Sequence, residues 1–483
     1  MRKAPDKMAG TGGGGPRLIF LHNCLALDSG HLVLSTLPNP TLMTRISPLL
    51  QARLTKPGML GLLASLSMTL PAAAADSAIN SGDTAWLLTS TALVLFMMIP
   101  GLALFYAGLV RARNVLSIFM QCFVLTAALS LLWLVCGYTL SFSDGGSFIG
   151  SMSKAFLNGV TPASTRADCP TIPELLHFAY QMMFFLITPG LFIGAFAERM
   201  RFSAMFIFSL VWSLVVYVPC CYGVWHKAGA FLGLTGVIDL AGGIVVHITA
   251  GVAALVLCIV VGPRKGFPTT QMLPHNLPLT LIGAGMLWVG WFGFNAGSQL
   301  AANGNAAMTL IVTHLSACTA ALVWMAIEWI KVQRPSALGI ATGSIAGLAA
   351  ITPASGKVGP IGAICIGAAS ALICWLACAK LKKKFRYDDA LDVFGVHGVG
   401  GFVGTILVAV FGSTSFAGGL GDFQIAAQLK TQLLAALYTT ILSAVASYVI
   451  LKVIALFIPL RVTSDEESQG LDLAEHGEAA YND

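Results

Sequence analysis

Long apolar stretches alternate with short polar connections from residue 84 to residue 459. Several exceed the ~20 residues that an α-helix needs to cross the hydrocarbon core of a bilayer. Because no water is available there, backbone groups must pair within each segment, which favours helices over the short alternating strands of a membrane β-barrel. We expect eleven transmembrane helices in an all-α polytopic membrane protein, near residues 84–109, 114–142, 174–197, 202–222, 240–261, 278–300, 305–330, 336–353, 357–380, 392–413 and 428–459.

The composition supports a membrane protein. Of the 483 residues, 56% are hydrophobic and only 10% are charged, whereas a soluble domain carries roughly 25% charged residues. Glycine is abundant (51 residues), and inside apolar segments it indicates close helix packing. The 11 cysteines are scattered and fit small buried side chains better than a metal or disulfide framework. The net charge of +6 comes from the connections, so it indicates topology and no nucleic-acid partner.

The N-terminal segment divides into two parts. Residues 43–75 have the features of a secretory signal peptide. Basic residues precede an apolar stretch at 59–70, and a run of alanines ends just before Asp76. Residues 1–42 are rich in glycine and proline and fit no signal peptide. We interpret 1–42 as a doubtful leader, either an over-extended reading frame or a disordered segment, with a functional extension as the alternative.

The basic residues of the connections predict the orientation. One alternating set of connections holds Arg111, Arg113, Arg199, Arg201, Arg264, Lys265, Lys331, Arg334, Lys382, Lys383, Lys384, Arg386 and Arg461. The other set holds Lys154, Arg166, Lys227 and Lys357, with Lys430 at its edge. The positive-inside rule places the richer set in the cytoplasm. An odd helix count then puts the mature N-terminus outside and the C-terminus inside. We therefore expect an inner-membrane protein with a membrane domain at 76–459 and a cytoplasmic tail at 460–483.

Two helices begin with related sequences. Asp239 precedes His247 by eight residues, and Asp392 precedes His397 by five, with glycine and valine between them in both cases. The two segments open helices five apart in the chain, so they enter the membrane from opposite sides. This pattern is typical of an inverted repeat of five plus five helices, with the C-terminal helix as an addition.

The two histidines are the strongest candidates for chemistry, because ionisable groups inside a bilayer are costly and tend to be functional. At ~1.5 Å per residue, His247 and His397 reach the same depth from opposite sides. Either one alone would fit a core histidine bonded to a backbone carbonyl. A neutral pair can pass a hydrogen bond or a proton. Three or four converging ligands would be needed for a metal, so we expect neither metal nor cofactor.

Aromatic residues form a second group of candidates. Phe294 and Ser298 lie four residues apart, on one helical face. Trp225 lies at the outer end of its helix, and Phe184 lies in the preceding helix. An aromatic face with a hydroxyl can attract a cation through cation–π attraction and one hydrogen bond. The alternative is an ordinary interfacial belt with core packing.

From about residue 80 to its end, the chain resembles bacterial ammonium transporters of the Amt family. The tail containing Gly-Leu-Asp472-Leu also resembles that family. The resemblance is carried by residues 239–250, 290–298 and 392–401, with support from 91–114 and 195–203. It implies transport of ammonium or ammonia by a homotrimer with one pore per subunit. It also implies a PII-type signal protein as partner at the cytoplasmic face.

The resemblance implies a role for each candidate. Trp225 and Ser298, with Phe184, match the site that recruits ammonium, and Asp239 matches the carboxylate that supports this site from behind. Phe184 and Phe294 match the stacked gate. His247 and His397 match the twin histidines of the pore. Tyr180 lies where some members carry another aromatic residue.

Two other functions stay open beside ammonium transport. The protein could act as a sensor that reports ammonium to a cytoplasmic partner, or as a neutral gas channel of the related Rh type. The signal peptide and the Gly-Leu-Asp-Leu tail favour the Amt type. The pore motifs contain no nucleophile–base pair and no metal set, so we expect no enzymatic activity.

Overall fold

The computed structural model describes residues 78–226 and 234–481. Within these two ranges the secondary structure is helical, apart from a few isolated bridges between single residues. The leader predicted at 1–42 and the signal peptide predicted at 43–75 lie outside the described residues.

The described chain contains ten helices that are long and apolar enough to cross a membrane, and one shorter apolar helix, α12. Together they confirm the predicted eleven-helix all-α fold. In chain order the spans are Ser81–Leu109 (α2, Ser81–Phe96, and α3, Ala103–Leu109), Ala112–Phe142 (α4, Val115–Leu132, and α5, Tyr138–Phe142), α6 (Glu174–Phe196), Phe202–His226 (α7, Phe202–Trp212, and α8, Val218–Cys221), Gly243–Val261 (with α9, Thr249–Val261), Leu277–Gln299 (with α10, Leu277–Ala296), α11 (Gly304–Val332), α12 (Ala337–Ile351), Pro360–Phe385 (α13, Pro360–Leu376, and α14, Lys382–Phe385), Phe394–Phe411 (with α15, Val399–Phe411) and α16 (Ile425–Ile454).

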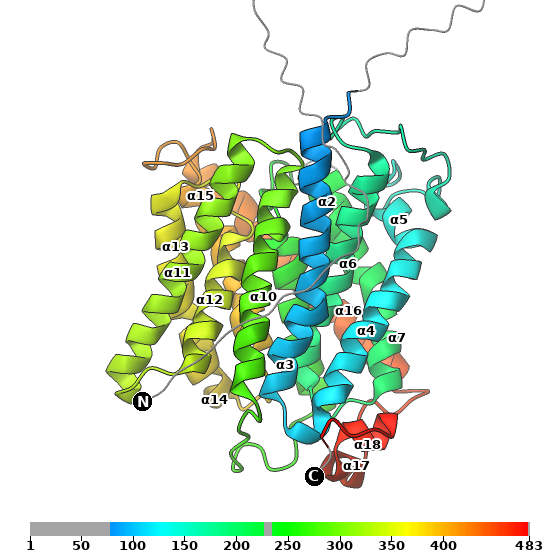
Figure 1. Ribbon diagram of the computed structural model, residues 1–483, viewed down its shortest axis with the longest axis vertical. Coiled ribbons are helices and arrows are strands. Elements are labelled where there is room, and N and C mark those ends of the chain that lie inside the picture. The colour runs from blue at the N-terminus through cyan, green and yellow to red at the C-terminus, as the bar shows by residue number, and fades with distance from the viewer. Residues whose placement is uncertain (1–77, 227–233, 482–483) are drawn as a thin grey trace, which may run out of the picture. The chain divides into compact units, whose positions relative to one another are not determined.

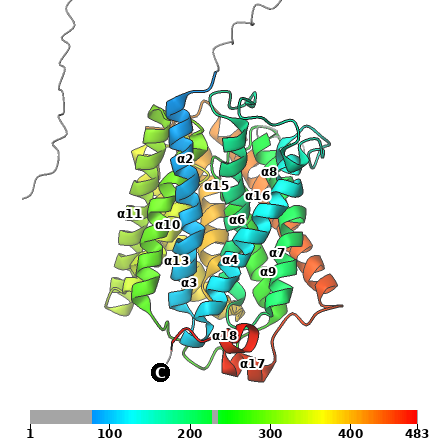
Figure 2. The same ribbon diagram turned by 45° about the vertical axis from the view of Figure 1, so that its right-hand side comes forward.

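The spans run side by side as a bundle, and two short helices close one end (Figures 1 and 2). These are α17 (Ser464–Gln469) and α18 (Leu471–His476), and we call their end of the bundle the tail side. The opposite end carries the connection at 143–173, and we call it the loop side. The described chain starts on the loop side and ends on the tail side, as an odd number of spans requires.

Glycines allow the two histidine-bearing spans to cross in direct backbone contact. A Cβ atom on Gly251 would lie 2.2 Å from the Cα of Gly398. A Cβ atom on Gly401 would lie 2.7 Å from the Cβ of His247. Both distances are far below van der Waals contact, so only hydrogen fits at these positions. Small residues at such a crossing are the usual means of bringing membrane helices close together.

A buried network of charges holds the tail side together. Glu198 accepts from Arg111 at 2.9 Å and from Arg264 at 3.1 Å, and Arg264 also pairs with Asp388 at 2.8 Å. Burial alone would raise the pKa of the Glu198 and Asp388 carboxyls, but the adjacent arginines hold both pKa values below their usual range. Both groups are therefore ionised at neutral pH, as buried charges that keep their partners can be.

The tail packs against this network. Asp472 accepts hydrogen bonds from the backbone N–H groups of Leu116 and Ser117, at 3.0 and 2.8 Å, in the first turn of α4. A carboxylate is stabilising at the N-terminus of a helix. Glu467 accepts from the N–H of Lys265 at 2.7 Å. The tail is thus an ordered part of the fold.

We predict that Gly251→Ala destabilises the protein by about 1–3 kcal/mol, the usual cost of overpacking a well-packed site. Thermal unfolding of the purified protein in detergent measures the effect. Gly285→Ala is the matched control, because a Cβ atom there meets nothing within 4 Å. Equal unfolding temperatures for the two variants would contradict the close crossing.

Candidate functional site

The glycine crossing brings the two predicted pore histidines into contact. Nδ1 of His247 lies 3.3 Å from Nδ1 of His397. The ring centroids are 5.3 Å apart, with an angle of 20° between the ring planes. Both side chains are buried, with relative exposures of 1% and 4%. The prediction that they meet inside the bundle agrees with this geometry.

The contact between two Nδ1 atoms dictates the proton positions. In a hydrogen bond between them, one ring must donate its Nδ1–H and the other must accept with a lone pair. Two neutral rings therefore adopt opposite tautomers. Nε2 of His247 is buried and has no hydrogen-bond partner among the described residues. The pair consequently offers a polar atom to a small solute in surroundings that are otherwise apolar.

A carboxylate holds the start of the helix that carries His247. Asp239 accepts four backbone N–H groups at 2.6 to 3.1 Å, from residues 242–245. Gly242 has φ +110°, a conformation that favours glycine, and the chain turns there into the span. Asp239 thus fixes the helix start eight residues before the histidine.

The second half of the molecule repeats this arrangement, but with a different aspartate from the one predicted. Asp389, not Asp392, accepts from the N–H of Phe394, at 2.8 Å, at the start of its span. Asp389 precedes His397 by eight residues, the same spacing as between Asp239 and His247. The spacing mismatch in the predicted repeat therefore came from choosing the wrong aspartate. Asp392 pairs instead with Lys382.

A pair of stacked phenylalanines lies next to the histidines. The rings of Phe184 (α6) and Phe294 (α10) are 4.3 Å apart, with an angle of 26° between their planes, and both are 1% exposed. The centroid of Phe294 is 6.2 Å from that of His247. Trp291, which is not among the predicted site residues, stacks on His247 with ring centroids 5.5 Å apart. Trp291 lies one helical turn before Phe294, and this spacing could have identified it as a further aromatic residue on the same face.

The predicted recruitment residues lie on the loop side of this gate. Trp225 packs edge-on against Phe184 at 5.6 Å, and its Nε1 donates to the carbonyl oxygen of Asp239 at 2.9 Å. The hydroxyl of Ser298 donates to the carbonyl of Phe294 at 2.8 Å. Asp239 therefore positions both the indole, through its backbone, and the histidine helix, through its side chain.

Tyr180 supports Ser298 from behind. Its hydroxyl lies 3.1 Å from Oγ of Ser298 and donates to the carbonyl of Phe294 at 2.9 Å. The ring of Tyr180 is fully buried and packs on Phe184 at 5.1 Å. Tyr180, which the sequence left without a definite role, thus positions the hydroxyl of the predicted recruitment site and one ring of the predicted gate.

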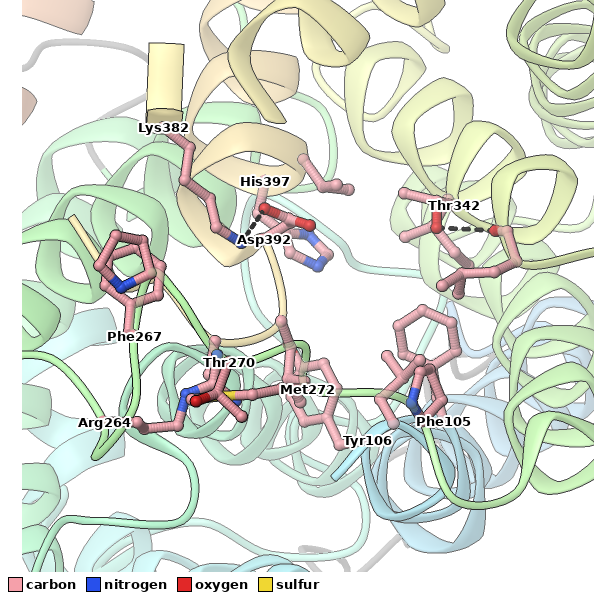
Figure 3. A pocket seen from close by; sticks show the side chains of 18 residues that line it. Phe105, Tyr106, Arg264, Phe267, Thr270, Met272, Thr342, Lys382, Asp392 and His397 are labelled. Atoms are coloured by element: carbon pink, nitrogen blue, oxygen red, sulfur yellow. Dashed lines mark hydrogen bonds and ion pairs between the residues drawn. The ribbon is translucent and has the colours of Figure 1, made fainter. Parts of the chain in front are cut away.

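Two cavities continue from the gate to the tail side. The first is narrow, about 10 Å³, which is room for a single water-sized molecule. Apolar side chains line it, together with His247, His397 and Phe294. The second, of about 340 Å³, is a wider vestibule that His397 also borders (Figure 3). The ring of Phe294, the histidine pair and the vestibule therefore follow one another towards the tail side.

This path defines a class of protein. A small, mostly apolar cavity inside a bundle of eleven membrane helices, with a hydrogen-bonding histidine pair in its wall and a wider vestibule beside it, is the layout of a transporter or channel for a small solute. In the described part of the chain, no group of three or more histidine, cysteine, aspartate or glutamate side chains could hold a metal ion.

Comparison with known proteins identifies the family. Residues 85–481 match the model of the Ammonium Transporter Family. An ammonium transporter of Bacillus subtilis is 46% identical over 83% of this chain and 99% of its own length. The ammonium transporter Amt1 of Archaeoglobus fulgidus is 42% identical over 83% of this chain and 100% of its own. The chain belongs to the Ammonium Transporter Family, so it is an ammonium transporter and not an enzyme.

Solved structures agree with this assignment. Mep2 of Saccharomyces cerevisiae aligns with a TM-score of 0.73 and 30% identity, covering 80% of this chain and 88% of its own. A sensor Amt protein aligns with a TM-score of 0.75 and 28% identity, covering 82% of this chain and 98% of that protein. The chain therefore shares its fold with Mep2 and with a protein described as a sensor Amt protein.

We predict that Asp239→Ala lowers the free energy of unfolding by about 1–3 kcal/mol, because buried N–H groups lose their acceptor. Thermal unfolding in detergent measures this effect, with Asp422→Ala on the exposed loop side as control. Ammonium transport should fall in the same variant, because the helix start that positions His247 loosens. Equal stability and transport in the two variants would contradict the anchoring role of Asp239.

Proposed function

We propose that this ammonium transporter recruits ammonium on the loop side, removes its proton at the gate and conducts ammonia past the histidine pair. Trp225, Ser298 and Phe184 form the recruitment site, with Asp239 behind it. Phe184 and Phe294 form the gate. The observation that carries the proposal is the hydrogen-bonded histidine pair in an apolar cavity directly beside the stacked phenylalanines.

Energetics favour passage of the neutral form. Transfer of an unpaired ion into an apolar medium costs tens of kcal/mol by the Born estimate, and the narrow cavity offers no carboxylate to compensate for it. Ammonium can avoid this cost by losing a proton, whereas potassium has none to lose. Selectivity then comes from acid–base chemistry more than from pore diameter.

The proton has two possible fates. It can travel along the His247–His397 hydrogen bond, which makes transport electrogenic, or it can return to the loop side, which makes the protein a neutral channel of the Rh type. The proximity of the two Nδ1 atoms favours the first route, because a proton relay needs a continuous hydrogen bond.

A sensor function is the second candidate. The likeness to a solved sensor Amt protein is the observation that favours it. The ordered tail, which caps α4 through Asp472, offers a surface through which a cytoplasmic partner could read the state of the bundle. Growth rescue of a transport-deficient cell on low ammonium separates the two functions, because a protein that only senses would not restore growth.

We further propose the cellular setting. Residues 43–75 are a cleaved signal peptide, residues 76–459 form the membrane domain in the cell inner membrane, and residues 460–483 are a cytoplasmic tail. The mature N-terminus is then outside, and the tail side is cytoplasmic. The protein assembles as a homotrimer and binds a PII-type signal protein at its cytoplasmic face. The distribution of basic residues and the resemblance to the Amt family support these proposals.

We predict that purified protein on a supported membrane gives a current with a pulse of ammonium and none with an equal pulse of potassium. His247→Ala should abolish most of the current, because the relay loses one imidazole. His314→Ala is the control, since His314 is exposed on the outside of the bundle.

An unchanged current in His247→Ala would eliminate the proton relay. Absence of current in the wild type, combined with an interior that turns alkaline on ammonium addition, would establish neutral ammonia conduction instead. Potassium currents of similar size would contradict selection by deprotonation.

A further inference from the structure

The vestibule on the tail side contains a charge arrangement that conduction of ammonia does not use. Its wall includes His397, at the end of the narrow passage, together with Lys382 and Asp392. Figure 3 shows the ion pair between the side chains of Lys382 and Asp392 in the wall of the vestibule that His397 also lines. An ion pair therefore lies in the wall of the cavity that borders His397 on the tail side.

Lys382 differs from the lysines that follow it in the chain. Its Nζ donates to Oδ1 of Asp392 at 2.7 Å, and its side chain is only 19% exposed. Lys383 and Lys384 are exposed and form no ion pair with any described residue. The basic run thus contains one lysine that turns into the vestibule and two that face away from it.

The end of a lysine side chain is itself an alkylammonium ion. It carries one positive charge and three N–H donors on a compact tetrahedral nitrogen. A carboxylate that holds this group at 2.7 Å has the charge and the hydrogen-bonding distance that suit ammonium. The backbone of Asp392, at φ +59°, presents this carboxylate from a conformation that few residues adopt.

A second carboxylate adds to the negative field. Asp389 is fully buried, and its Oδ1 has no hydrogen-bond partner among the described residues. Burial raises the pKa of Asp389 to about 6, even though the positive charge of Lys382 lowers it. Lys382 thus favours the charged form of the Asp389 carboxyl.

We propose that Asp392 marks an ammonium-binding site at the cytoplasmic mouth of the pore and that Lys382 is its tethered occupant. The inference rests on the proposed function, in which ammonia emerges past His397. Ammonia that reaches the aqueous vestibule takes a proton from hydronium or from a buffer acid in the water and becomes ammonium. If the Asp392 carboxylate were free, it would retain this ammonium in the vestibule. Because Lys382 neutralises the carboxylate, the ammonium is released.

The test compares Lys382→Met with Lys383→Met, which removes the same charge from a neighbouring exposed position. Thermal unfolding in detergent is measured with increasing ammonium chloride and with tetramethylammonium chloride, which cannot donate hydrogen bonds. We expect Lys382→Met alone to gain an ammonium-specific stabilisation over the wild type. The gain should disappear in the double variant Lys382→Met/Asp392→Asn, and Lys382→Arg should resemble the wild type.

Transport gives a second measurement. Uptake of ¹⁵N-labelled ammonium is followed in proteoliposomes loaded with unlabelled ammonium, with protein-free liposomes as the baseline. Half-inhibition by internal ammonium should occur at about 10-fold lower concentration in Lys382→Met than in Lys383→Met, which corresponds to ~1.4 kcal/mol. Lys382→Gln provides a second neutral replacement if the methionine variant does not fold.

Identical behaviour of the Lys382 and Lys383 variants in both measurements would overturn the inner site. An ammonium-specific stabilisation that persists in the double variant would also overturn it, because Asp392 would then not be the ligand. Failure of the wild type to take up labelled ammonium would contradict the proposed function instead, while the binding comparison would still decide the inference.

Discussion

The close crossing of two glycine-lined spans is the constraint on which the rest of the site depends. Gly251 lies against Gly398, and Gly401 lies against His247, with no space for a side chain at either contact. This contact brings two imidazoles from opposite halves of the chain within hydrogen-bonding distance. Neither histidine would meet a polar partner of this kind if the helices were held apart by larger residues. The stacked phenylalanines and the narrow cavity lie next to that meeting point.

Charged side chains lie near both ends of the histidine pair, and among the described residues none lines the narrow cavity between them. Asp239 and Asp389 each hold a helix start eight residues before a histidine, one on each side of the crossing. Placing these carboxylates at the helix ends lets backbone N–H groups stabilise their charge. The passage between them is apolar apart from the imidazoles. An ion meets favourable charge at the ends and a barrier at the centre, which favours a solute able to shed its proton.

Sequence periodicity was sufficient for the fold, because apolar runs of membrane-spanning length leave few alternatives to helices. The chemical candidates were also accessible, since ionisable residues in such runs are rare. Tertiary relations were harder to predict. Asp389 was overlooked because Asp392 lies closer to His397 in the sequence, although the eight-residue spacing of Asp389 matches that of Asp239 and His247. The hydrogen bond to Phe394 identifies Asp389 as the equivalent residue. Lys382 belongs to a basic run that predicts topology, so its turn into the vestibule follows from packing alone.

The most direct test of the central claim is ¹⁵N nuclear magnetic resonance of the protein labelled at histidine, in lipid bilayers at neutral pH. His247→Ala and His397→Ala spectra assign the two rings. The geometry predicts two neutral imidazoles of opposite tautomer, with a scalar coupling across the Nδ1–Nδ1 hydrogen bond. Two rings of the same tautomer, or a pair without coupling, would contradict a histidine pair that is joined at the crossing.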